Sequence, residues 1–327
     1  MRRRAFIGLL GGGSAIWPLA ARSQQRRPVI GFLAVASPTT VGPVLLPAFR
    51  RGLEEIGFAE GHNVTVEYLW ADGLYDRLPA LAAEFVNRRV DVIAAAGGSI
   101  TAQAAKAATA TIPIIALPGD DPVWLGFAAS LNRPAGNVTG VVQLVIASGA
   151  KRLELLRELL PDAKVIAFLN NPARPNASRQ TQDMQAAADV LGVRLAEIEA
   201  DNDDDLPSSI AAARTQASAL VVAGDPYFLA RQHRIVALAG QHALPTMYFF
   251  REFVTAGGLI SYGSNLANAY HQVGVYAGKV LKGARPADLP MIQQSDQLEL
   301  VLNMRTARAL GLQVPATLLA QADEVIE

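Results

Sequence analysis

The chain has 327 residues, no cysteine, and 29 basic against 29 acidic side chains. The lack of cysteine excludes disulfides, thiolate metal sites, a cysteine nucleophile and a lipid-anchored N-terminal cysteine. Beyond residues 1–23 the sequence has no basic run, and the chain has no net positive charge, which argues against a nucleic-acid partner. At roughly 100–200 residues per domain, the length predicts two domains.

The first 23 residues have the pattern of an export signal. Three arginines at positions 2–4 precede a short, glycine-rich apolar stretch, and Ala21 and Ser23 supply small side chains at a cleavage site. Residues 3–7 fit the twin-arginine pattern of bacterial export. The apolar stretch is too short for a membrane anchor, which needs about 20 apolar residues. We therefore expect an exported protein whose mature chain begins near Gln24 and carries 25 basic against 29 acidic residues.

The mature chain alternates short apolar segments with longer alanine-rich ones. In the first half, strands are expected at 28–33, 63–68, 90–95 and 113–117, and helices over 42–56, 78–87 and 99–110. In the second half, strands are expected at 164–169, 194–198, 219–223, 245–248 and 258–262, and helices over 153–160, 180–191 and 206–216. This alternation predicts right-handed βαβ units in parallel sheets. Two similar halves predict an α/β fold of two doubly wound, Rossmann-like lobes, joined by a crossover near residues 135–150.

Polar residues follow nearly every predicted strand. Ligands of such folds lie beyond the carboxyl ends of the strands, so these residues predict a cleft between the lobes. Helix N-termini suit a carboxylate and aspartates suit an ammonium, which together favour a small zwitterion. The candidate ligand-binding residues are Ser37, Thr39, Gly98, Ser99, Asp121, Asn171, Asp225, Tyr248, Ser261 and Tyr262.

Within this set, specific roles can be predicted. We expect Asp121 and Asp225, one from each lobe, to flank the ligand, and Ser99 with its neighbouring amides to hold an acidic group. Tyr248 and Tyr262 are expected to form a stacking wall. Taken singly, each of these residues also suits a helix cap or a turn, so the prediction depends on their recurrence after strand upon strand.

Signals for an enzyme are weak. The four histidines are scattered without metal-ligand spacing, and Gly97-Gly98-Ser99 lacks both the G-x-G-x-x-G spacing and a Walker lysine. The nucleophile elbow G-x-S-x-G is also missing from the sequence. We therefore expect a binding protein with no cofactor and no metal. The alternatives are an exported enzyme that acts on a small metabolite in the same cleft, and a ligand sensor for a membrane signalling protein.

Blocks spread along the whole chain carry a resemblance to a known family. They include residues 27–33, Gly-Asn-Val-Thr-Gly at 136–140, Lys-Arg-Leu-Glu-Leu-Leu at 151–156, and Arg-Glu-Phe-Val at 251–254. In these blocks the chain resembles bacterial periplasmic substrate-binding proteins of ABC importers, of the tryptophan/tyrosine type. The resemblance implies a type I periplasmic binding protein fold, in which two lobes joined by three crossings close on a ligand.

The resemblance also implies boundaries and partners. Lobe one would comprise residues 28–145 plus 265–290, and lobe two residues 146–264 plus 291–327. We expect a monomeric periplasmic receptor that captures a small polar or zwitterionic, amino-acid-like solute, aromatic ones included, and delivers it to a membrane ABC permease.

Overall fold

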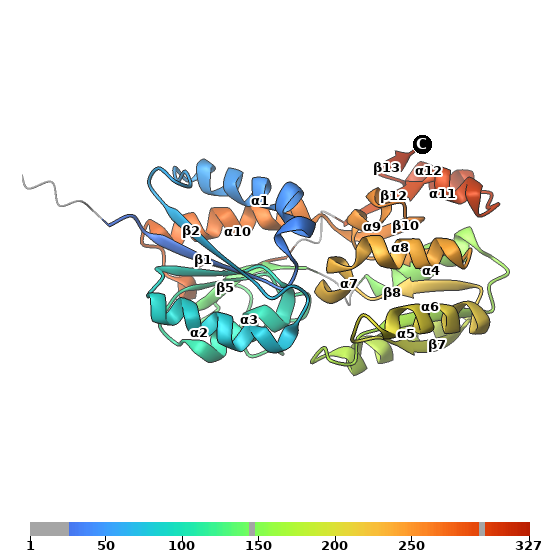
Figure 1. Ribbon diagram of the computed structural model, residues 1–327, viewed down its shortest axis with the longest axis horizontal. Helices are drawn as coiled ribbons and strands as arrows, with labels where there is room; N and C mark the ends of the chain where they lie inside the picture. Colours follow the sequence, from blue (N-terminus) through green and yellow to red (C-terminus); the bar gives the residue numbers. More distant parts are fainter. Residues whose placement is uncertain (1–25, 144–147, 294–297) are drawn as a thin grey trace, which may run out of the picture.

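The computed structural model describes residues 26–143, 148–293 and 298–327, so the predicted export signal lies outside the described residues. The described chain forms two α/β lobes that lie side by side (Figure 1). The predicted two-lobed architecture with parallel sheets is confirmed. Within the part of the chain that the structure describes, no helix is both long and apolar enough to cross a bilayer.

Lobe one is built on a six-stranded parallel sheet with the order β11-β5-β4-β3-β1-β2. Its core strands are continuous apolar runs, as expected for strands that are covered on both faces. The strands are β1 (Val29–Ala34), β2 (Thr65–Trp70), β3 (Val92–Ala95), β4 (Ile114–Ala116), β5 (Val138–Val142) and β11 (Ile292–Gln293). The helices are α1 (Pro38–Glu55), α2 (Leu78–Arg88), α3 (Gly98–Ala108) and α10 (Leu266–Leu281), with short 3-10 turns η1 (Tyr75–Arg77) and η2 (Pro286–Asp288).

Helix α10 returns from the second half of the chain to pack beside α1 on one face of this sheet, while α2 and α3 cover the other face (Figure 1). Two glycines allow the close approach of α1 and α10. A Cβ atom on Gly52 would lie 2.0 Å from the His271 carbonyl oxygen, and one on Gly274 would lie 2.1 Å from that of Phe49. Real Cβ contacts are never this short, so the pairing of the two helices requires glycine at both positions.

Lobe two contains a seven-stranded sheet with the order β13-β12-β10-β9-β8-β6-β7. Its strands are β6 (Val165–Asn170), β7 (Arg194–Glu199), β8 (Ala219–Val222), β9 (Thr246–Tyr248), β10 (Ile260–Ser264), β12 (Leu298–Asn303) and β13 (Glu324–Ile326). Strand β12 runs antiparallel to β10, whereas the other pairs are parallel. The helices are α4 (Gly149–Leu159), α5 (Ala177–Leu191), α6 (Asp205–Gln216), α7 (Pro226–Ala230), α8 (Gln232–Gln241), α9 (Arg251–Thr255), α11 (Met304–Ala309) and α12 (Ala316–Gln321).

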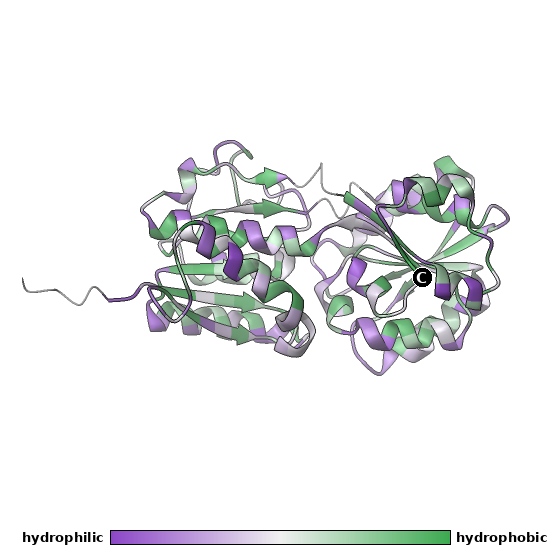
Figure 2. Cartoon of the chain, turned by 90° about the horizontal axis from the view of Figure 1, so that it is seen from above, coloured by the Kyte–Doolittle hydropathy of each residue, from purple (hydrophilic) through white to green (hydrophobic). Residues whose placement is uncertain are grey.

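The chain passes between the lobes three times: between β5 and α4, between β10 and α10, and between β11 and β12. The sheets thus assign residues 28–143 and 266–293 to lobe one. The expected boundary at residue 290 is slightly too early, because β11 pairs with β5 in the sheet of lobe one. In both lobes the inner strands are mostly apolar, and hydrophilic residues are concentrated on the outer helices and loops (Figure 2).

Candidate ligand-binding site

The loops that follow the parallel strands of the two lobes meet between the lobes. Asp120 follows β4 of lobe one and is only 3% exposed. Its carboxylate accepts hydrogen bonds from Ser99 Oγ of the same lobe at 2.5 Å and from Arg174 Nη2 of lobe two at 3.3 Å. Asn176 Nδ2 of lobe two also donates to this carboxylate. A single buried acidic group therefore joins donors from both lobes.

A second contact between the lobes lies nearby. Tyr75 of lobe one donates its hydroxyl hydrogen to Asp225 Oδ1 of lobe two at 2.6 Å. Burial raises the pKa of Tyr75 well above its usual value, and the Asp225 charge raises it further, so the phenol remains protonated and able to donate. Asp225 Oδ1 also caps α7 by accepting from the Tyr227 backbone N–H at 2.7 Å. The second oxygen, Oδ2, is buried and accepts no hydrogen bond from the described residues.

Glycine lets the backbone of lobe one approach a proline ring of lobe two closely. Gly98 opens α3 with φ of +81°, and a Cβ atom there would lie 2.9 Å from Pro226 Cγ of lobe two. Only glycine adopts this backbone angle without strain, and only glycine leaves room for the proline. The first turn of α3 can therefore approach α7 closely in this arrangement.

Three cavities adjoin these contacts, and Gln143 lines all of them. Two are lined by both Gly98 and Pro226 and measure about 20 Å³ each, space for about one water molecule. The third is a recess of about 360 Å³ whose walls include Asp121, Trp124, Val142, Arg179 and Gln293. Gln143 is 4% exposed, and its Nε2 atom finds no acceptor in the described part of the chain. A polar donor thus lies where the narrow and wide cavities meet.

Lobe two also contributes a buried cationic group. Arg152 of α4 is fully buried, donates to Ser148 Oγ at 2.9 Å, and lies with its guanidinium carbon 5.0 Å from the centre of the Phe249 ring. Burial, followed by the charge of Arg174, lowers the pKa of Arg152 to about 9. Two guanidinium groups close together in a buried region favour an anionic group beside them.

The structure brings three of the sequence-predicted residues, Gly98, Ser99 and Asp225, to the contact between the lobes. Asp121 lines the wide recess and caps the turn after β4 by accepting from the Val123 N–H at 2.8 Å. Asn171 is buried and stabilises a turn, where its Oδ1 accepts from the Ala173 N–H at 3.0 Å.

The other predicted residues lie apart from this contact. Ser37 and Thr39 hydrogen-bond to each other at 2.8 Å at the start of α1. Ser261 is buried on β10. Tyr262 beside it is half-buried and lies close enough to Arg152 to raise the pKa of that guanidinium, against the larger lowering by burial.

The expected stacking wall is not formed, because Tyr248 points into the core of lobe two. Its ring stacks on Phe253 with 4.6 Å between the ring centres, and the side chain is 1% exposed. Successive side chains of a strand point to opposite faces of the sheet, and Tyr248 takes the face covered by α8 and α9.

Four residues at this contact were not predicted from the sequence: Tyr75, Asp120, Arg174 and Asn176. Asp120, Arg174 and Asn176 lie in loops that follow strands, a few positions from a predicted residue, whereas Tyr75 begins η1 and lies far in sequence from every predicted residue. Asp120 precedes the chosen Asp121, and Arg174 comes three residues after the chosen Asn171. The sequence shows only that a residue lies in a loop after a strand. It does not show which of two adjacent polar side chains faces the other lobe.

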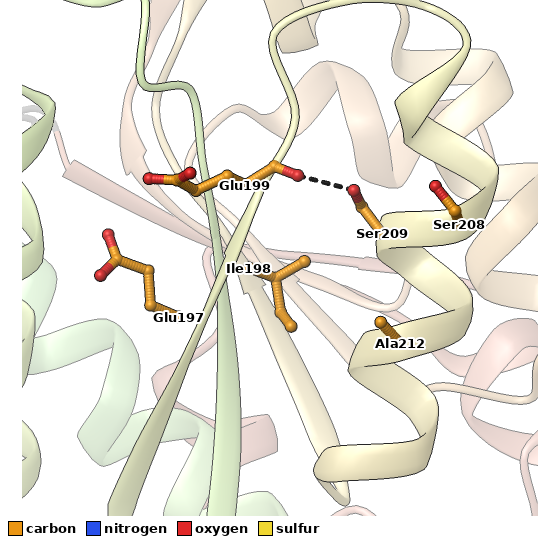
Figure 3. A pocket seen from close by; sticks show the side chains of 6 residues that line it. All are labelled: Glu197, Ile198, Glu199, Ser208, Ser209 and Ala212. Carbon is orange, nitrogen blue, oxygen red and sulfur yellow. Dashed lines mark hydrogen bonds between the residues drawn. The ribbon is translucent and has the colours of Figure 1, made fainter.

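Another hollow lies away from the contact between the lobes. It measures about 510 Å³ and is bordered by the edge strand β7 and by α6 (Figure 3). Ser209 Oγ donates to the Glu199 backbone carbonyl oxygen at 2.6 Å at its rim, and the side chain of Glu197 lies along the same strand. This open depression holds no residue of the contact between the lobes.

Comparison with known proteins agrees with this architecture. Residues 46–326 match the family model for ABC transporter substrate binding proteins. The chain is 28% identical over 265 residues to a tyrosine-binding protein of Clostridioides difficile (strain R20291). The aligned region covers 81% of this chain and 76% of that protein. Two solved structures share the fold over 92% of this chain and all of theirs. They are a conserved domain protein from Vibrio cholerae (TM-score 0.83, 26% identity) and an ABC domain in complex with L-Trp from Streptococcus pneumoniae (TM-score 0.82, 24% identity).

The fold is that of the type I periplasmic binding proteins. The resemblance seen in the sequence is confirmed, and so is the expectation of a binding protein rather than an enzyme. The chain belongs to the family of ABC transporter substrate-binding proteins.

Proposed function

We propose that the protein is a periplasmic receptor that binds a free amino acid between its lobes and delivers it to an ABC permease. The family and the predicted export signal support the location and the permease partner. The tyrosine-binding relative supports an amino acid as the ligand. In this proposal the receptor acts as a monomer.

This proposal rests on the hydrogen bonding of the buried Asp225 carboxylate. Its carboxylate is fully buried where the lobes meet, yet Oδ2 accepts no hydrogen bond from the described residues. A buried acceptor without a donor costs about 1–3 kcal/mol. An ammonium group is the donor that compensates a buried carboxylate best, because it also supplies the opposite charge. The α-ammonium of an amino acid therefore fits Asp225.

The wide recess suits the side chain of such a ligand. Trp124 is 52% exposed at its wall, and the Arg179 guanidinium carbon lies 5.2 Å from the Trp124 ring centre, which connects lobe one to lobe two at this point. The narrow cavities of about 20 Å³ are far smaller than an amino acid. The ligand can therefore enter only when the lobes move apart.

Isothermal titration calorimetry with L-tyrosine as the first probe, followed by the other nineteen amino acids, tests the proposal. Asp225→Asn should weaken binding by roughly 10- to 150-fold, the loss of one charge-assisted hydrogen bond. The control is Asp323→Asn, a second lobe-two aspartate that accepts from a backbone N–H, that of Leu300 at 2.8 Å. Absence of binding to any amino acid, or equal affinities for the two variants, would refute the proposal.

A further inference from the structure

Two chemical groups of lobe one contact lobe two at neighbouring positions. The Tyr75 hydroxyl donates a hydrogen to the Asp225 carboxylate, and the Asp120 carboxylate accepts from Arg174 and Asn176. The receiving groups lie close together, since Arg174 Nη1 also donates to the Gly224 carbonyl oxygen at 2.9 Å, one residue before Asp225. A hydrogen donor and a carboxylate side by side are also what the head group of an α-amino acid presents.

We propose that Arg174 and Asn176 form the carboxylate site for the ligand on lobe two, and that Tyr75 and Asp120 occupy the amino-acid site as an internal surrogate when the lobes close without it. This inference rests on the proposed function, and it assigns the second end of the ligand. The ligand ammonium replaces the Tyr75 hydroxyl at the Asp225 carboxylate and also donates to its Oδ2 atom, and the ligand carboxylate replaces Asp120 at Arg174.

Charge balance supports the carboxylate site. Arg174 is 7% exposed, and Asp120 is the one carboxylate within 4.0 Å of it among the described residues. When the lobes separate, Asp120 leaves with lobe one, and Arg174 stays on lobe two beside the second buried guanidinium, that of Arg152. A ligand carboxylate restores the lost counter-charge, whereas a neutral or cationic ligand does not.

The site is also fixed in shape before the ligand arrives. Arg174 Nη1 is held by Gln180 Oε1 at 2.8 Å and by the Gly224 carbonyl oxygen, both in lobe two. The Nη2 group is thereby directed toward lobe one, where it meets Asp120. Because these supports belong to lobe two alone, the orientation of Arg174 does not depend on closure, and the open protein already presents the site.

The effect of an Asp120 substitution on ligand affinity distinguishes a surrogate from a residue that contacts the ligand. If Asp120 competes with the ligand, Asp120→Asn should bind L-tyrosine roughly tenfold more tightly, because the closed, self-occupied state becomes less populated. If Asp120 instead contacts the ligand, the same variant should bind more weakly. The matched control is Asp91→Asn, another lobe-one aspartate that accepts from a backbone N–H, that of Val29 at 2.7 Å.

A second comparison tests the carboxylate site directly. Arg174→Gln should weaken L-tyrosine binding by 10-fold or more without weakening the binding of L-tyrosine amide, which lacks the carboxylate. An equal loss for both ligands would show that Arg174 only supports the fold. If L-tyrosine does not bind, the same pair of experiments uses the amino acid that does, with its amide.

The proposed function and the surrogate can be refuted separately. No binding of any amino acid to the wild-type protein would refute the proposed function and this inference with it. Binding to the wild type, with unchanged or weaker affinity in Asp120→Asn, would refute the surrogate alone.

Discussion

The contact between Gly98 and Pro226 gives a direct test of how the lobes close. Gly98→Ala adds a Cβ atom 2.9 Å from Pro226 Cγ across the interface, whereas carbon atoms in contact lie about 3.5–4.0 Å apart. The lobes must therefore separate by at least about 0.6 Å at this point or distort. We expect the closed arrangement to lose roughly 1–3 kcal/mol, the usual cost of overpacking.

The substitution has a second effect that must be separated from the first. At φ of +81°, alanine is strained by about 1–2 kcal/mol wherever it lies in the chain. Gly126 of the same lobe supplies the control, because it has φ of +69° and nothing within 4 Å of its hypothetical Cβ atom. Gly126→Ala should thus reproduce the backbone strain without the contact to lobe two.

Thermal unfolding and small-angle scattering of the ligand-free proteins distinguish the two effects. Both variants should lower the melting temperature by about 2–8 °C. Only Gly98→Ala should increase the radius of gyration, because only that variant obstructs closure. A radius equal in both variants and the wild type would show that this contact does not limit closure and would refute the reasoning.

Two further predictions concern the rest of the chain. Glu252 of α9 has a buried Oε2 atom without a hydrogen bond from the described residues, and desolvation raises its pKa from 4.5 to about 7. Because the unfolded chain ionises first as the pH rises, Glu252 destabilises the folded protein progressively between pH 4.5 and 7. Glu252→Gln should therefore gain about 1–3 kcal/mol over the wild type across that interval in urea titrations, with a constant difference above it, and a difference independent of pH would contradict this. N-terminal sequencing of the exported protein should find Gln24 or a residue beside it first, whereas an intact Met1 in the exported fraction would exclude cleavage.

The βα units could be predicted from the sequence because each is encoded locally. The apolar run at 90–95 yields β3 at Val92–Ala95, and the alanine-rich segment expected from Ser99 yields α3 from Gly98. Helix α1 begins at Pro38, four residues before the expected start, since proline is tolerated in the first turn of a helix. The periodicity of buried strands and amphipathic helices therefore determines most elements without tertiary information.

Elements that depend on distant partners could not be predicted from local periodicity. Strand β5 contains Gly140 and lies in the segment where the sequence predicts a crossover. Pairing with β4 on one side and β11 on the other fixes it in the sheet. The antiparallel β12 is likewise defined by its pairing with β10. Such segments acquire their structure from neighbours that lie far away in sequence.

The amino-acid sequence is sufficient to predict the two-lobed α/β class and an export signal, and it directs attention to the loops after the parallel strands. Which side chains in those loops meet depends on how the two lobes pack together. Asp120 and Asp121 are adjacent and identical in chemistry, but the backbone turns one toward Arg174 of lobe two and the other toward its own turn. The physical reason is that a hydrogen bond requires specific atoms within about 3 Å, and that distance is set by the packing of two lobes rather than by residue type or spacing.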